Sequence, residues 1–344
     1  MQFTAISSIF DGTARMSVAR RHLFSFWRHN TLKKFLNLLR AEIVMHLRQV
    51  RIPSLPYMVK IEPTRLCNLK CPGCPSALGH VNDVNLNMPF SLYKKIVDEL
   101  GDYLYKISLY GWGEPLLNKE IYDMISYANA RNIAVVISSN LLALTEANAE
   151  KLIASGLEHL IVSIDGLSQE TYEKYRVGGK VEKALENLQV LLKMRHEQHR
   201  KLPLVEWQFL LMRDNEHELV EARRLAADLG ADRFTVKSFF DETTGCFEAQ
   251  TSLGAIKYNR RGQLIKRKRA CYWLWASADI LFDGTVMPCC FKSSIPKMGN
   301  LGSHSFASIW NNETYQADRL LFRKGLKDYP PNATNECLNC LLFR

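Results

Sequence analysis

Residues 57–74 read YMVKIEPTRLCNLKCPGC, an extended apolar run that leads directly into Cys67, Cys71 and Cys74 at CxxxCxxC spacing. Three thiolates on one loop can bind three irons of a cubic cluster and leave the fourth iron open, whereas ferredoxin-type clusters take four cysteines and carry electrons. An iron without a cysteine ligand can bind an external ligand and act on it. Short cysteine spacings also mark structural zinc sites, and His80 is near enough in the sequence to complete one. The spacing alone leaves both interpretations open.

Short β-type runs alternate with helical patterns from residue 57 onward. The predicted strands are 57–62, 104–110, 133–138, 159–164, 205–211 and 232–238. The predicted helices between them are 90–100, 118–131, 145–155, 180–196 and 215–229. Such alternation predicts a parallel sheet with helical crossovers. Because eight units would close a full barrel, six units predict an α/β fold with an open, partial (β/α)6 TIM-like barrel.

Polar residues follow four successive predicted strands, at the edge where the loops of parallel barrels build their active sites. The first strand leads into the cysteine loop, and the second leads into YGWGEPLLN, whose glycines allow close backbone approach. Each signal is weak alone, but their placement after successive strands predicts one shared site. The candidate residues outside the cysteine loop are Gly111, Gly113, Glu114, Ser138, Asn140, Ser163, Asp165 and Arg176.

A second group of cysteines follows the barrel pattern. Its members are Cys271, Cys289, Cys337 and Cys340. Four thiolates would saturate one 4Fe-4S cluster, which suits electron transfer, and zinc held by the same residues is the alternative. Cys290 could replace Cys289, although the spacing from Gly284 favours Cys289. We therefore expect a barrel domain over 57–245 and a small C-terminal iron-sulfur cluster domain over 246–344.

Together these motifs resemble the radical S-adenosylmethionine (SAM) superfamily with a C-terminal SPASM or twitch domain, over roughly residues 57–344. In that family the open iron chelates the amino and carboxylate groups of SAM. The resemblance implies that the GWGEP loop binds the amino group and that Arg176 pairs with the carboxylate, a surface arginine being the alternative. It also implies contacts to the ribose and carboxylate of SAM from Ser138, Asn140, Ser163 and Asp165.

The sequence departs from the family pattern at three places. Gly73 stands before the third cysteine, where the family usually has an aromatic residue near the adenine, and Trp112 replaces a common glycine. No further cysteines follow the CLNC of Cys337 and Cys340, which matches the twitch form with one auxiliary cluster.

The resemblance implies an oxidoreductase in which the first cluster cleaves SAM to a 5'-deoxyadenosyl radical that abstracts hydrogen from a substrate. The expected reaction is oxidation of a polyol, or of a sugar-linked or lipid-linked alcohol, with the auxiliary cluster as electron acceptor. A peptide-modifying maturase is the alternative, and a non-catalytic iron-sulfur electron carrier is an alternative of another class. A flavodoxin or ferredoxin is the expected electron donor. No catalytic side chain can be assigned.

Composition favours a soluble cytoplasmic protein. The chain has 47% hydrophobic residues and nine cysteines among 344 residues, too few for a disulfide scaffold, and no apolar run approaches the ~20 residues of a membrane span. Its net charge is +10, and residues 1–60 contain ten Lys or Arg against two acidic residues. No motif with interleaved aromatic residues supports nucleic-acid binding.

Residues 1–56 form an N-terminal extension with a basic amphipathic helix over 31–50. Asn30 or Thr31 is the expected N-cap, and Pro53 the stop. We expect the apolar stripe of this helix to pack on the barrel. Peripheral docking of the same stripe on an anionic membrane, or on an acidic partner, is the alternative.

Overall fold

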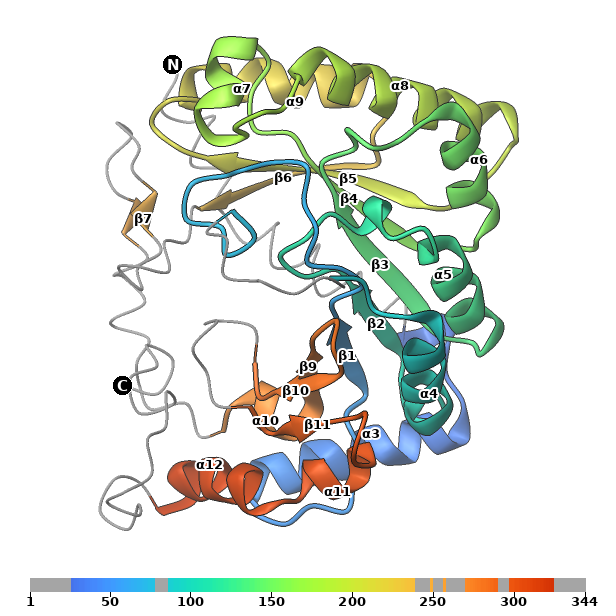
Figure 1. The fold of residues 1–344 in the computed structure, drawn as a ribbon, viewed down its shortest axis with the longest axis vertical. Coiled ribbons are helices and arrows are strands. Elements are labelled where there is room, and N and C mark those ends of the chain that lie inside the picture. The colour runs from blue at the N-terminus through green and yellow to red at the C-terminus, as the bar shows by residue number, and fades with distance from the viewer. Residues whose placement is uncertain are drawn as a thin grey trace.

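The computed structural model describes residues 26–77, 86–238, 248–249, 256–257, 270–289 and 297–324. Its centre is a curved sheet that begins with six parallel strands in chain order (Figure 1). The strands are β1 (Met58–Ile61), β2 (Lys106–Leu109), β3 (Ala134–Ser139), β4 (His159–Ser163), β5 (Leu204–Leu211) and β6 (Arg233–Ser238). The partial barrel predicted from the alternating pattern is therefore confirmed.

Helices cover the outer face of this sheet. The main ones are α4 (Phe90–Leu100), α5 (Ile121–Ala130), α6 (Glu146–Ala154), α8 (Val181–Glu197) and α9 (Leu219–Asp228). Shorter elements are η1 (Pro115–Leu117), α7 (Gln169–Tyr175) and η2 (Glu216–Glu218). Neither η1 nor α7 was predicted. Alternate strand residues such as Ile107, Val135 and Leu160 are fully buried in the core. The other residues of each strand line the inner face, as the two-residue period of a strand requires.

The C-terminal segment extends the same sheet beyond β1. It contributes β9 (Ser277–Ile280), β10 (Thr285–Met287) and β11 (Gly299–Asn300), so that nine strands of the described residues form one sheet. β9 pairs with β1 in parallel, and β10 pairs with β9 in antiparallel fashion. Gly284 makes the turn between β9 and β10 at φ +83°, where a side chain would be strained. The predicted boundary at 245/246 lies outside the described residues, and the two expected domains share a sheet.

Three helices accompany these strands at the base of the molecule. They are α10 (Tyr272–Ala276), α11 (Phe306–Trp310) and α12 (Glu313–Lys324), and a separate two-stranded sheet joins β7 (Glu248–Ala249) to β8 (Ile256–Lys257). Tryptophans fix this region to the chain before β1. The indole of Trp275 donates to the carbonyl of Gln49 at 2.9 Å, and that of Trp310 donates to the carbonyl of Ser54 at 2.9 Å.

The N-terminal helix α3 (Leu32–His46) packs with the opposite face from the one expected. Its N-cap is Thr31, as predicted, but it ends well before Pro53, and Arg48 follows at φ +51°. The buried residues are Lys34, Asn37, Ala41 and Val44. The expectation that the apolar stripe packs on the barrel is wrong, because polar hydrogen bonds, described below, hold the other face against the protein.

Candidate functional site

Cys67, Cys71 and Cys74 lie on the loop that follows β1. Cys71 is buried, the other two are half-buried, and all three are free thiols. The backbone N–H of Cys74 donates to the carbonyl of Cys71 at 3.1 Å, which closes a tight turn. Gly73 occupies this turn at φ +74°. An aromatic side chain at residue 73 would have to adopt the left-handed region, so the local backbone explains why glycine stands there.

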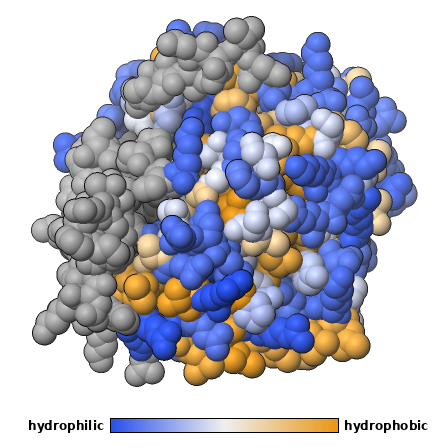
Figure 2. All heavy atoms as spheres, turned by 60° about the horizontal axis from the view of Figure 1, so that its bottom comes forward, coloured by the Kyte–Doolittle hydropathy of each residue, from blue (hydrophilic) through white to orange (hydrophobic). Residues whose placement is uncertain are grey.

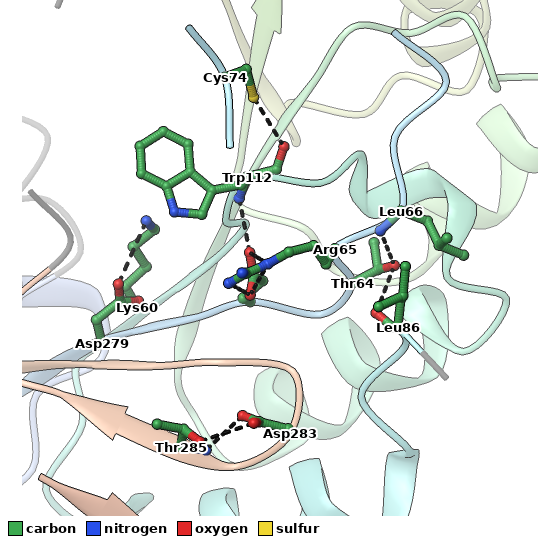
Figure 3. A network of polar contacts seen from close by, with 11 residues as sticks. Lys60, Thr64, Arg65, Leu66, Cys74, Leu86, Trp112, Asp279, Asp283 and Thr285 are labelled. Carbon is green, nitrogen blue, oxygen red and sulfur yellow. Dashed lines mark hydrogen bonds and ion pairs between the residues drawn. The ribbon is translucent and has the colours of Figure 1, made fainter. Parts of the chain in front are cut away.

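The GWGEP loop after β2 packs directly on the cysteine loop (Figure 3). The Sγ of Cys74 donates to the carbonyl of Trp112 at 3.8 Å, and the N–H of Glu114 donates to the carbonyl of Leu66 at 2.7 Å. A Cβ on Gly113 would stand 2.3 Å from the Thr64 carbonyl oxygen. Gly113 is therefore required for packing of the chain against itself, and the predicted contact of this loop with SAM stays a prediction.

Gly111 serves the same packing. A Cβ there would stand 2.4 Å from Cγ of Glu62, whose carboxylate accepts from the N–H of Trp112 at 3.1 Å. The Glu62 carboxylate also pairs with Arg65 at 2.8 Å (Figure 3). The loop after β2 and the loop after β1 are thus fixed to each other before any ligand is added.

The carboxylate of Glu114 is buried, with 3% of the residue exposed. It accepts hydrogen bonds from the Ser139 hydroxyl at 2.7 Å and from the backbone N–H of Asn140 at 2.8 Å. The N–H of Leu116 donates to it at 3.1 Å. Burial raises the pKa of Glu114, and these three donors and the Arg176 charge oppose the rise. The arrangement ties the end of β3 to the GWGEP loop.

Arg176 forms a buried ion pair with Asp165 beside the cysteine loop. Its Nε donates to Oδ2 of Asp165 at 2.6 Å, and its Nη1 lies 3.9 Å from the Sγ of Cys71. Arg176 caps the C-terminus of α7, and its side chain is 16% exposed. The alternative of a surface arginine is therefore wrong. Asp165 also accepts from the N–H of Leu210 at 2.7 Å, which anchors the pair to β5.

The serine and amide side chains predicted for the site lie at the ends of β3 and β4. The hydroxyls of Ser138 and Ser163 are 3.4 Å apart on adjacent strands. The Asn140 amide donates to Oδ1 of Asn68, on the cysteine loop, at 2.8 Å. The structure therefore brings Ser138, Asn140 and Ser163 to the same edge of the sheet as the cysteines, whereas their contacts to SAM remain predicted.

The three thiols fit the ligand set of an iron-sulfur cluster. Burial raises the pKa of Cys67 to about 11 and also raises the pKa of Cys71, the latter opposed by Arg176. Because iron binds thiolate, cluster assembly releases these protons. No three His, Cys, Asp or Glu side chains in the described ranges group closely enough to hold a single metal ion. A cubic cluster takes one thiolate per iron, so its ligands need not converge on one point.

One pair in this region was missed by the sequence reasoning. Nζ of Lys60 on β1 lies 3.8 Å from Oδ2 of Asp279 on β9, and 5.6 Å from the centroid of a Trp112 ring (Figure 3). Oδ1 of Asp279 is buried without a hydrogen-bond partner. Burial raises the pKa of Asp279 to about 6, against the lowering effect of Lys60. The sequence did contain a signal for this pair. Lys60 is a charged residue inside the predicted strand 57–62, and Asp279 is a charged residue inside an apolar β-type run.

Two of the predicted auxiliary ligands lie in the described part of the chain. Cys271 immediately precedes α10, Cys289 follows β10, and both are half-buried. β10 is antiparallel to β9, so the end of β10 that leads to Cys289 lies beside the start of β9. Cys271 is joined to that start of β9 by the short helix α10. The two cysteines are therefore at the same end of this strand pair. Cys290, Cys337 and Cys340 lie outside the described residues, as does His80.

Two family models match the chain. The radical SAM superfamily matches residues 61–226, and SPASM, an iron-sulfur cluster-binding domain, matches residues 271–341. The chain therefore belongs to the radical SAM superfamily and carries a C-terminal SPASM domain. Its cofactors are accordingly a SAM-binding 4Fe-4S cluster, an auxiliary iron-sulfur cluster and SAM.

Several curated proteins are similar to this chain. An AdoMet-dependent heme synthase of Methanosarcina barkeri is 27% identical over 61% of the chain, and the match spans 58% of that protein's own length. The tungsten-containing aldehyde ferredoxin oxidoreductase cofactor-modifying protein of Pyrococcus furiosus is 25% identical over 82% of the chain and 86% of its own length. A PqqA peptide cyclase of Bradyrhizobium diazoefficiens is 24% identical over 75% of the chain and 74% of its own length.

A solved structure shares the fold across both domains. Streptococcus suis SuiB, crystallised with the precursor peptide SuiA, superimposes with a TM-score of 0.64 at 15% sequence identity, covering 88% of this chain and 72% of SuiB. At that identity the likeness establishes the fold alone.

Proposed function

We propose that this enzyme uses SAM radical chemistry to modify a peptide or protein substrate. The observation that carries the proposal is the similarity to a PqqA peptide cyclase, which covers 75% of this chain and 74% of that protein. The fold shared with SuiB, a protein crystallised with its precursor peptide, is consistent with it. The polyol oxidation expected from the sequence has no support among these relatives, so the alternative of a peptide-modifying maturase replaces it.

The chain's own residues have assignable tasks in this reaction. Cys67, Cys71 and Cys74 would hold the first cluster, and Arg176 is close enough to Cys71 for its guanidinium to face a carboxylate bound at the open iron. The Glu114 carboxylate would accept a hydrogen bond from the SAM ammonium. When bound, the cluster and SAM supply a 5'-deoxyadenosyl radical that removes one hydrogen atom from the substrate. Burial of Glu114 and Asp165 would limit the access of water to their contacts with SAM.

Lys60 and Asp279 are assigned to the substrate. They lie on adjacent strands, one from the barrel and one from the C-terminal segment, and Lys60 contacts the ring of Trp112 beside the cysteine loop. Oδ1 of Asp279 would accept a hydrogen bond from a backbone amide of the peptide, or a proton released during the reaction. The auxiliary cluster as electron acceptor, and a flavodoxin or ferredoxin as donor, complete the proposal.

A peptide-pool experiment tests the substrate class. Reconstituted protein is incubated without oxygen with SAM, dithionite and a low-molecular-weight extract, and 5'-deoxyadenosine is measured by chromatography. Half of the extract is first digested with a protease mixture that is then inactivated. Stimulation by the intact extract alone, with a mass change in one of its peptides, is the expected result. Equal stimulation by both halves would show that the substrate is not a peptide.

A further inference from the structure

The outward face of α3 carries a continuous stripe of large apolar side chains. Its residues are Leu32, Phe35, Leu36, Leu39, Ile43 and Leu47, with exposed fractions between 42% and 75%. Trp27, just before the helix, is 87% exposed. Soluble proteins rarely expose a contiguous apolar surface of this extent unless it binds something. In Figure 2, which brings the base of Figure 1 forward, apolar residues gather along the lower edge of the molecule.

Specific polar contacts fix the helix with this stripe outward. Nζ of Lys34 donates to the carbonyl of Asn132 at 2.6 Å. The Asn37 side chain bonds both backbone groups of Leu55, donating to its carbonyl at 2.9 Å and accepting from its N–H at 3.0 Å. The Tyr57 hydroxyl donates to Glu42 at 2.7 Å. Turning the helix to bury the stripe would break every one of these bonds, so its exposure belongs to the folded state.

The charges around the stripe are mostly basic. Lys33 and Arg40, one heptad apart, lie on one flank of it and are exposed, and Lys33 pairs with the exposed carboxylate of Asp102 at 2.6 Å. Arg28, which lies 3.9 Å from the Glu158 carboxylate, and Arg51 are exposed at either end of the helix. Glu42, the one acidic residue of α3, bonds to Tyr57. The preceding residues 1–27 add three arginines against one aspartate. An apolar face with Trp, Phe and Leu beside Lys and Arg is the pattern of a helix that lies in a membrane interface.

We propose that α3 docks this protein on the surface of an anionic lipid bilayer, with its stripe in the interface and its basic flank against the headgroups. Acidic lipids complement the basic flank, which a second copy of the same basic surface would not. The helix precedes β1 and the cysteine loop follows it, so the two lie at opposite ends of this strand. Docking of the helix on a bilayer would therefore leave the cysteine loop away from the membrane. The inference is independent of the peptide substrate proposed above.

Vesicle co-sedimentation tests this surface on the full-length reconstituted protein. The probes are vesicles of phosphatidylglycerol mixed with phosphatidylcholine, and vesicles of phosphatidylcholine alone. The test variant carries Leu36→Asp and Ile43→Asp. The matched control carries Val190→Asp and Val220→Asp, which change two exposed apolar residues on α8 and α9, 37% and 71% exposed. Circular dichroism and thermal melting should be unchanged in both, because all four side chains face solvent.

We expect the wild-type protein and the matched control to bind the anionic vesicles and not the neutral ones. The stripe variant should lose roughly tenfold or more in vesicle partitioning, since two apolar side chains that would insert into the bilayer interface are replaced by anions. Raising the salt concentration should weaken binding of the wild type.

Three results would overturn the proposal. One is the absence of binding to anionic vesicles. Another is binding that the stripe variant retains in full. The third is a wild-type dimer in light scattering that the stripe variant dissociates without any capture by vesicles, because the stripe would then join two copies of the chain.

Discussion

The ion pair of Arg176 and Asp165 is buried, and a buried charge without its partner is costly. Arg176→Ala should lower the free energy of unfolding by about 3 to 5 kcal/mol, because it leaves the Asp165 carboxylate uncompensated. Urea unfolding of the iron-free protein measures the loss without a contribution from the cluster. Arg131→Ala, which breaks an exposed pair with Asp98, is the control and should cost less than about 1 kcal/mol. Equal losses in the two variants would contradict the assignment.

Glu114 combines a structural task with a proposed binding task, and two substitutions separate them. Glu114→Gln keeps the shape and one oxygen acceptor, whereas Glu114→Ala leaves the Ser139, Asn140 and Leu116 donors without an acceptor. Loss of the charge-assisted bond to SAM should weaken binding by about 1.5 to 3 kcal/mol, roughly ten- to a hundredfold, in both variants. Calorimetry with SAM measures this, with iron content expected to be intact. An unchanged dissociation constant in Glu114→Gln would leave Glu114 with a structural role only.

Asp279 makes stability depend on pH in a direction that can be worked out. Its pKa is raised from 3.8 to about 6, so the folded state holds the proton more tightly than the unfolded chain. The stability it contributes is fully present below its ordinary pKa and is lost as the pH rises through about 6. Asp279→Asn should therefore gain up to about 3 kcal/mol relative to wild type between about pH 4 and about pH 7. Urea unfolding of both proteins at several pH values tests this, and a stability difference that stays constant across that range would contradict it.

The residues of the site differ in how far the sequence could predict them. Cys67, Cys71 and Cys74 stand in one local motif whose spacing brings them together, whereas Arg176 was predicted only from the family resemblance. The pair of Lys60 and Asp279 depends on β1 lying beside β9, a contact between segments more than two hundred residues apart. No local pattern specifies that pairing, so the strand register had to come from the structure.

At the scale of elements, α3 shows which face of a helix carries its packing energy. Asn37→Ala should lower the free energy of unfolding by about 1 to 3 kcal/mol, because the partly buried N–H and carbonyl of Leu55 lose their partner. Leu39→Ala, on the outward stripe, should change stability by less than about 0.5 kcal/mol. Thermal or urea unfolding of both variants decides the orientation. A larger loss for Leu39→Ala would mean that the apolar stripe, and not the polar face, packs on the protein.

Helical periodicity predicted the position of α3 in the sequence, but not which face of the helix packs against the protein. The period of Leu32, Phe35, Leu39 and Ile43 identifies an apolar stripe, and apolar burial is the usual reason for one. In this chain the opposite face is held by hydrogen bonds to Leu55, Asn132 and Tyr57, which are distant in sequence or belong to irregular backbone. Periodicity carries no information about such bonds, whereas the barrel strands and their crossover helices follow from local patterns and were predicted almost residue by residue.

At the scale of the whole molecule, the barrel and the C-terminal segment form one hydrogen-bonded body. β9 is registered with β1 from Met58↔Ser277 to Ile61↔Ile280, and Arg319 donates to the carbonyls of Leu274 and Val50. Buried Trp275, Trp310 and Phe306 fill the core beneath these strands. The fold around Cys271 and Cys289 thus has support that does not depend on bound iron.

Because the β1–β9 pairing and the tryptophan core do not need iron, each cluster can be removed separately by substituting its cysteines. Cys271→Ala with Cys289→Ala should lower the iron content from about eight to about four per chain, since each cluster holds four irons. The far-ultraviolet circular dichroism should be retained, because the sheet pairing and the tryptophan core persist. SAM cleavage should continue, because it needs only the open iron held by the barrel loop, while formation of a two-electron oxidised product should fall.

Substitution of Cys67, Cys71 and Cys74 by Ala is the reciprocal control. It should also remove about four irons but abolish 5'-deoxyadenosine formation, because no open iron is then available to bind SAM. The two variants together distinguish a redox role of the auxiliary cluster from a bracing role. If the folded Cys271→Ala, Cys289→Ala protein completes turnover at the wild-type rate, the auxiliary cluster does not accept the substrate's electron. Stoichiometric zinc in place of iron in protein purified without oxygen would contradict both cluster assignments.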